Sequence, residues 1–175
     1  MRKIILYIAT SLDGYIADRD GSVDWLTGDG SGEDSDSYAK LLERADTVLL
    51  GWNTYHQIVT QLSPERWVYD GLESYVFTHR PLPSVPGITF TAADPRALVR
   101  ELKARPGKDI WLCGGAALTQ TLAAAGLIDR YELTVIPTLL GGGVPLFGAL
   151  PEERKLHLLH TAVHNGMTEL VYVPR

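Results

Sequence analysis

The stretch IWLCGGAALTQTLAAAGLID, residues 110–129, passes from a short apolar run through two glycines into a segment with the composition of a helix. The run Ile110–Cys113 is typical of a strand, and Ala116–Ala125 is followed by another glycine, the residue most common just after a helix. Gly114 and Gly115 therefore lie at the carboxyl end of a strand, directly before a helix whose first amide groups have no intrahelical partner. Such a junction favours a sheet in which strands and helices alternate.

The same alternation extends along the rest of the chain. Short runs rich in β-branched and aromatic residues predict further strands at Ile4–Thr10, Thr47–Gly51, Ser74–Thr78, Ile88–Thr91 and Tyr131–Pro137. Helical spacing and capping residues predict helices at Tyr38–Ala45 and 94–104. The C-terminal segment reads as two strands joined by Asn165 and Gly166, the pair that most strongly favours a tight hairpin. The sequence thus predicts an α/β fold with an antiparallel hairpin at the edge of its sheet.

Composition narrows the class of protein. The 175 residues are 45% hydrophobic and 21% charged, which predicts one soluble globular domain spanning 1–175. A net charge of −5 argues against a nucleic-acid partner, and no apolar stretch approaches the roughly 20 residues that cross a bilayer. The N-terminus lacks a signal-peptide pattern, and the single cysteine, Cys113, is expected to be a buried strand residue in a reducing cytoplasm. The histidines have no metal-ligand spacing, so we expect no metal site.

Three strand ends carry groups that suit a phosphate ligand. Gly114 and Gly115 allow close approach of a pyrophosphate to the free amides of the next helix, although a plain tight turn explains a lone glycine pair equally well. Gly51 precedes Thr54, whose hydroxyl could bond a phosphate or simply cap its helix. The third strand end carries Thr78, His79 and Arg80, which offer a hydroxyl, an imidazole and a guanidinium. The alternatives are an ordinary strand end for Thr78 and a solvated surface charge for Arg80. Together the three ends favour a dinucleotide along the carboxyl edge of the sheet.

An ordered set of motifs resembles the dihydrofolate reductase superfamily. The motifs are YIATSLDGYIAD, VLLGWNTY, YVFTHRP, IWLCGGAALTQTL and DRYELTVIPTLLGGGVPLF, and they cover nearly the whole chain. The forms SLDGYIA and GGGVPLF point to the bacterial branch related to the reductase domain of riboflavin biosynthesis. The resemblance implies a dihydrofolate-reductase-like mixed, mainly parallel sheet flanked by helices, with NADPH as cofactor and a homodimer as the assembly.

The resemblance also implies roles for individual residues. Ala9, Ile16 and Ala17 resemble positions that approach the nicotinamide, and Asp13 with Gly14 resembles the mobile loop beside it, for which a simple turn is the alternative. The segment expected to meet the pyrophosphate consists of Gly51, Trp52, Asn53 and Thr54, and the glycine-rich turn and helix start beneath the phosphates consist of Gly114, Gly115, Ala116 and Ala117.

The position after Gly51 departs from the family, which often has a basic residue where this chain has Trp52. That departure leaves Arg80, with Thr78 and His79, as the candidate that distinguishes NADPH from NADH.

Substrate chemistry is less defined. The resemblance calls for an acid on the helix after Trp25, and the acidic stretch offers Glu33, Asp34 and Asp36, for which a solvated loop is the alternative. We expect Asp36 as the catalytic acid, and Trp25, Asp34 and Thr134 at the substrate; for Thr134 an ordinary β-branched strand residue is the alternative. The run Gly141–Gly143 with Pro145 could line the pocket mouth or form a structural turn.

These observations predict a cytoplasmic, NADPH-dependent reductase that transfers hydride to a C=N or C=O bond of a small heterocyclic, pterin-like or pyrimidine-like substrate. The alternative is a non-catalytic nucleotide-binding or regulatory dimer on the same fold.

Overall fold

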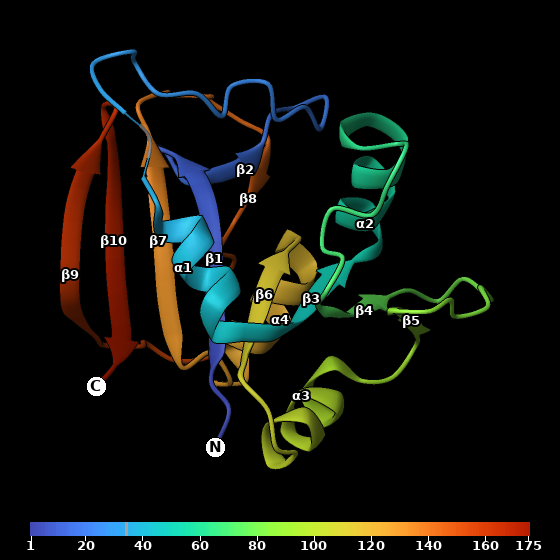
Figure 1. Cartoon of the computed structure of the whole chain (residues 1–175). Helices are drawn as coiled ribbons and strands as arrows, with labels where there is room; N and C mark the ends of the chain where they lie inside the picture. Colours follow the sequence, from blue (N-terminus) through green and yellow to red (C-terminus); the bar gives the residue numbers. More distant parts are fainter. Residues whose placement is uncertain (34) are drawn as a thin grey trace.

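A single large sheet of eight strands organises the chain (Figure 1). The structure is a computed structural model, and it describes residues 1–33 and 35–175. The strand order is β5-β4-β3-β6-β1-β7-β10-β9. The bounds are β1 (Ile4–Ser11), β3 (Ala45–Gly51), β4 (Glu73–Phe77), β5 (Ile88–Thr91), β6 (Asp109–Gly114), β7 (Arg130–Ile136), β9 (Leu156–His164) and β10 (Met167–Pro174). The pairs from β5 to β7 are parallel, whereas β10 and β9 run antiparallel, so the predicted mixed, mainly parallel α/β fold is confirmed.

Helices cover both faces of this sheet because its central strands are apolar on both sides. Ile4 and Leu6 of β1 join a core cluster with residues of α3 (Pro95–Ala104) and α4 (Ala116–Ala124). Ile5, which points to the opposite face, joins a second cluster with residues of α1 (Ser37–Arg44) and of η1 (Ile58–Leu62), a π-helical turn that continues α2 (Trp52–Gln57). Alternation along the strand therefore supplies two cores, as expected for a parallel sheet buried on both sides.

The C-terminal hairpin follows its predicted turn chemistry. Asn165 has φ 49° and Gly166 has φ 71°, and Met167 lies opposite His164 in the ladder between β9 and β10. Left-handed conformations at both turn residues match the twist of the two strands, which is why an Asn-Gly pair is favoured there.

A second, small sheet was not predicted from the sequence. It pairs β2 (Tyr15–Ala17) with β8 (Val144–Pro145) in antiparallel fashion. Strands of two or three residues are too short to produce a periodic pattern, so only the tertiary structure reveals them. Within the part of the chain that the structure describes, none of the helices combines the length and apolar character that crossing a bilayer requires.

The edge of the large sheet leaves β9 without a neighbour on one side, and its Val163 side chain is 69% exposed. A long edge with unpaired backbone groups is normally covered, and a second copy can add its own β9 across a two-fold axis. We propose a homodimer that buries this edge. Light scattering should then report twice the mass of one chain, and Val163→Lys should shift the protein toward monomer.

Val85→Lys is the matched control, because Val85 is also exposed but lies beside β5, at the opposite edge of the sheet. A parent protein that stays monomeric at high concentration, or equal dissociation in both variants, would contradict this assembly.

Candidate functional site

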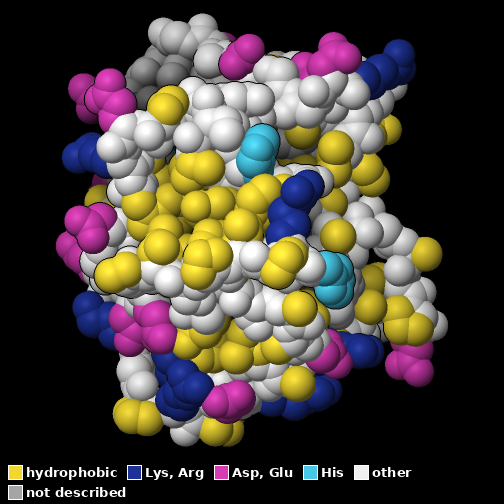
Figure 2. Space-filling model, turned by 90° about the vertical axis from the view of Figure 1, so that its right-hand side faces the viewer, with side chains coloured by type: hydrophobic (Ala, Val, Ile, Leu, Met, Phe, Trp, Pro, Cys, Tyr) yellow, Lys and Arg dark blue, Asp and Glu magenta, His cyan; other side chains and the backbone are white. Residues whose placement is uncertain are grey.

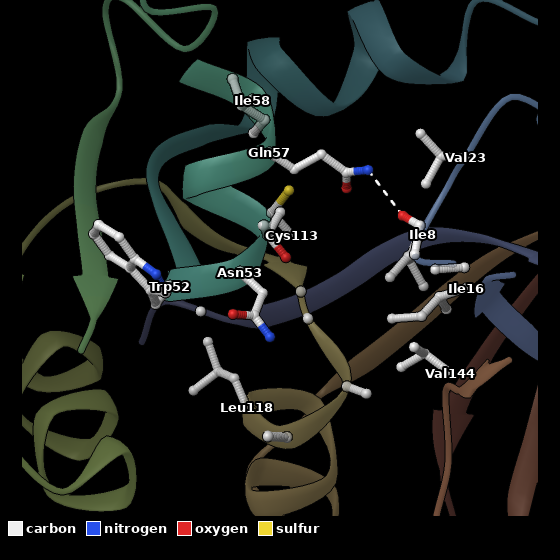
Figure 3. A pocket seen from close by; sticks show the side chains of 18 of the residues that line it. Ile8, Ile16, Val23, Trp52, Asn53, Gln57, Ile58, Cys113, Leu118 and Val144 are labelled. Carbon is white, nitrogen blue, oxygen red and sulfur yellow. Dashed lines mark hydrogen bonds between the residues drawn. The ribbon is translucent and has the colours of Figure 1, made fainter. Parts of the chain in front are cut away.

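A cavity of about 730 Å³ opens at the carboxyl ends of β1, β3 and β6. Figure 2 shows the corresponding face of the molecule, where hydrophobic side chains gather in the middle and a cationic side chain lies at their border. The cavity lies between α2 and the start of α4, and the small sheet forms another wall (Figure 3). The structure brings most of the predicted cofactor residues to this one cavity: Ala9, Ile16, Ala17, Gly51, Trp52, Asn53, Thr54, Gly114, Gly115, Ala116 and Ala117.

The floor of the cavity is built from glycines at two neighbouring turns. Gly114 has φ +132°, a conformation that side-chain-bearing residues rarely adopt, and its peptide bond to Gly115 is cis. A Cβ on Gly51 would lie 3.4 Å from the amide nitrogen of Gly115, and a Cβ on Gly115 would lie 3.1 Å from Thr54 Oγ1. The turns after β3 and β6 therefore lie close together, with the Gly51 backbone beside the Gly115 amide.

The start of α4 adds backbone donors to this floor. Its N-cap is Gly115, which provides no side-chain cap, and Ala116 and Ala117 both line the cavity. The first amides of a helix lack intrahelical acceptors and lie at the positive end of the helix dipole. This corner can hold an anionic group such as a phosphate.

The wall opposite α2 depends on the three glycines Gly141–Gly143. Gly143 has φ +136°, and a Cβ there would overlap the carbonyl of Ala17. Because that side chain is absent, the chain lies directly against β2, and the next residue, Val144, faces the cavity with Ile16 (Figure 3). The run is a structural turn that also brings a wall residue to the cavity.

Asp13 ties the two halves of this wall together. Its carboxylate accepts hydrogen bonds from Ser11 Oγ at 2.6 Å and from the amides of Leu140 and Gly141 at 3.1 and 2.7 Å. The Ser11 hydroxyl, followed by these amides, holds the pKa of the Asp13 carboxyl below its ordinary value. Asp13 does not line the cavity, and its observed contacts give it a positioning role in the loop.

Three polar side chains of the cavity lining escaped sequence analysis or were assigned otherwise. Gln57 Nε2 donates to the carbonyl of Gly21 at 2.9 Å and so links α2 to the loop after β2 (Figure 3). Tyr69 and Cys113 share a hydrogen bond between Oη and Sγ at 3.5 Å, and both line the cavity. Burial raises the pKa of the Cys113 thiol to about 11, so this cysteine is a neutral wall residue.

Arg80 approaches the rim of the cavity from the end of β4. Its guanidinium carbon lies 4.7 Å from the centre of the Trp52 ring, a cation–π geometry. Within residues 1–33 and 35–175, the Arg80 side chain has no ion pair, so its charge remains available. Thr78 and His79 do not line the cavity: the Thr78 hydroxyl accepts from the Arg80 amide at 3.1 Å, and His79 is exposed.

The expected substrate residues that the structure describes do not line the large cavity. Asp36 and Thr134 line a second cavity of about 440 Å³ between α1 and the strands β7, β10 and β9. Asp36 pairs with Lys40 at 2.7 Å, and this hydrogen bond lowers the pKa of its carboxyl. Trp25 lines neither cavity, and its Nε1 donates to Ser22 O at 3.1 Å within its own loop. Asp34 falls outside the described residues.

The two cavities differ sharply in charge. The lining of the large cavity, within the described chain, contains no Asp, Glu, His, Lys or Arg. The second cavity holds Glu132, which is almost fully buried and accepts bonds from both Arg44 and Arg130. Across the described ranges no three His, Cys, Asp or Glu side chains gather as a metal site would require.

Comparisons with known proteins agree on one family. The family model of the RibD C-terminal domain matches residues 2–168. The uncharacterized protein YwjB of Bacillus subtilis is 40% identical over 175 residues, which cover 98% of each chain. The crystal structure of a candidate riboflavin biosynthesis protein from Shewanella sp. PV-4 superimposes with a TM-score of 0.82 at 30% identity, covering 100% of this chain and 99% of that one.

A more distant structure shares the fold. It is a Thermotoga maritima diaminohydroxyphosphoribosylaminopyrimidine deaminase/5-amino-6-(5-phosphoribosylamino)uracil reductase, with a TM-score of 0.71 and 17% identity. The match covers 99% of this chain and 57% of that one.

The contacts of Asp13 predict the effect of removing its carboxylate. In Asp13→Ala the amides of Leu140 and Gly141 lose their acceptor, so the loop that carries Val144 should open more often. We expect hydrogen exchange at these two amides to accelerate on the order of tenfold, while the amides of β6 keep their protection. Asp20→Ala is the control, because Asp20 is exposed and its side chain makes no contact with this loop. Equal exchange in both variants would refute the positioning role of Asp13.

Proposed function

The chain belongs to the RibD C-terminal domain family, and from this premise we propose that it is a cytoplasmic, NADPH-dependent reductase. The proposed reaction is hydride transfer to a C=N or C=O bond of a small pyrimidine-like heterocycle. One observation carries the proposal: a single cavity with an uncharged lining contains both a site for an anion and an apolar region large enough for a second ring. The anion site, which we call the anion corner, consists of the turn at Gly115 and the start of α4.

The residues on the cavity floor fit the phosphates of a dinucleotide. The turn at Gly115 exposes backbone amides, and the amides of Ala116 and Ala117 follow at the start of α4. The hydroxyl of Thr54 lies beside this turn, and no described residue occupies it with a hydrogen bond. Donors without nearby carboxylates suit a pyrophosphate, because its negative charges meet attraction without opposing repulsion.

Arg80 supports a preference for NADPH. Trp52 stands where the family often has a basic residue, and the Arg80 guanidinium stacks on that tryptophan from the neighbouring strand end. The chain therefore supplies a cation to the same rim from another element. A planar guanidinium without an ion pair can donate paired hydrogen bonds to the extra phosphate of NADPH.

The middle of the cavity suits the nicotinamide. Ala9 and Ala17 leave room for a flat ring, and Ile16 provides an apolar wall beside it. When bound, the cofactor supplies a hydride from its nicotinamide ring. Because no titratable acid of the described chain lines this cavity apart from the neutral thiol and phenol, we propose that water delivers the accompanying proton.

The glycine floor generates the first test. In Gly115→Val, the added side chain would meet Thr54 Oγ1 and crowd the anion corner, so NADPH affinity measured by calorimetry should fall about tenfold or more. Gly115 has an ordinary φ, so the backbone itself tolerates the substitution. Gly115→Ala, which adds only the Cβ, should lose less.

Gly32→Val is the matched control, because a Cβ there meets only ordinary contacts and the residue does not line the cavity. A folded Gly115→Val protein with unchanged NADPH affinity would reduce the glycine pair to a structural turn.

The rim cation generates the second test. Arg80→Ala should weaken NADPH binding roughly tenfold to a hundredfold and leave NADH binding nearly unchanged, because only NADPH carries the extra phosphate. Arg100→Ala removes an equal charge from the exposed side of α3 and should affect neither cofactor.

Equal losses for both cofactors, or a parent protein without preference for NADPH, would exclude this role of Arg80. A parent that binds NADPH but never oxidises it with heterocyclic substrates would instead support the non-catalytic alternative.

A further inference from the structure

One part of this cavity is largely apolar and lies away from the start of α4 (Figure 3), and we call it the apolar compartment. It is formed by the loop after β2, by the end of α2 with η1, and by the segment before β4. Its wall consists of Val23, Leu26, Gln57, Ile58, Leu62 and Tyr69. The Gln57 hydrogen bond to the carbonyl of Gly21 joins α2 to the loop at this compartment (Figure 3).

We infer that this compartment selects a neutral, flat heterocycle without a phosphate group. The inference rests on the proposed function and names the substrate class of the same site. It separates this chain from the Thermotoga maritima enzyme, whose name specifies a phosphoribosylamino substrate.

Charge is the first argument for this selection. A phosphate dianion that leaves water needs cationic or hydrogen-bonding partners, since an unpaired buried charge is strongly disfavoured. The compartment wall has no Lys, Arg or His in the described chain. The loop beside it adds exposed acids, Asp20 and Asp24, on either side of residues that line the cavity. These acids would repel a phosphate further.

The three cations nearest in the sequence do not line the compartment. Arg19 donates to the carbonyl of Gly141 at 2.9 Å. Arg66 follows η1 in an exposed turn and does not line the cavity. Arg80 stacks on Trp52 at the ends of β3 and β4, on the cofactor side.

The polar groups of the compartment match a neutral ring. Gln57 uses Nε2 to bond Gly21, so its Oε1 is left to accept a hydrogen bond from a ligand. The Tyr69 hydroxyl is shared with Cys113. An N–H or amino group on a heterocycle can donate to Gln57 while its faces contact Val23 and Ile58, which is the usual combination in small-molecule sites.

A matched pair of ligands tests the inference directly. The probes are 5-amino-6-(5-phosphoribosylamino)uracil and the same compound without its phosphate. We expect calorimetry to show that the full-length protein binds the unphosphorylated compound at least about tenfold more tightly. Tighter or equal binding of the phosphorylated compound would overturn the inference, as would binding of neither compound.

Each titration is run with and without NADPH, so that the two proposals can fail separately. Loss of NADPH binding would count against the proposed cofactor, whereas the ligand comparison without NADPH still decides the substrate class.

A charge introduced into the wall gives a second measurement. Leu26 is partly exposed and lines the cavity, so Leu26→Lys can keep its stem on the wall and extend its ammonium group toward the ligand. It should tighten binding of the phosphorylated probe about tenfold. Thr27→Lys adds the same charge at a neighbouring exposed residue outside the lining and should leave that affinity nearly unchanged. The same gain in both variants would overturn the placement of the ligand in this compartment.

Discussion

The close packing of two strand-to-helix turns is the constraint on which the rest of the site depends. The turn after β3 passes so near the turn after β6 that a Cβ on Gly51 would lie 3.4 Å from the Gly115 amide nitrogen. Gly114 needs glycine for its left-handed φ of +132°, and a Cβ on Gly115 would come within 3.1 Å of Thr54 Oγ1. The start of α4 follows this turn and lines the cavity. A larger residue at Gly115 would crowd Thr54 and the anion corner.

The opposite wall uses backbone approach of the same kind but holds it with a carboxylate. Gly143 lets the glycine run lie against β2, and Asp13 binds the amides of Leu140 and Gly141. An ionised carboxylate is a stronger acceptor than a carbonyl, so one exposed side chain can order a loop that lacks regular structure. The cavity therefore has one wall fixed by the large sheet and one fixed by local hydrogen bonds.

Charge is partitioned between the two cavities. The large cavity has an uncharged lining with one cation at its rim, whereas the second cavity contains Glu132 bonded by Arg44 and Arg130. An uncharged, largely apolar lining suits two flat rings, because their faces can pack against it. The ion pair of Arg44 with Glu132 instead joins α1 to β7.

The sequence by itself determined the alternation of strands and helices, the hairpin at Asn165 and Gly166, and the family of the chain. These features follow from local preferences: apolar periodicity, turn conformation and the unpaired amides at a helix start. The tertiary structure alone decided that Asp36 and Thr134 face another cavity, that Arg80 stacks on Trp52, and that Gln57 reaches the loop at Gly21. Such pairings join residues from different elements, and their formation depends on how the strands are ordered in space, which local sequence does not encode.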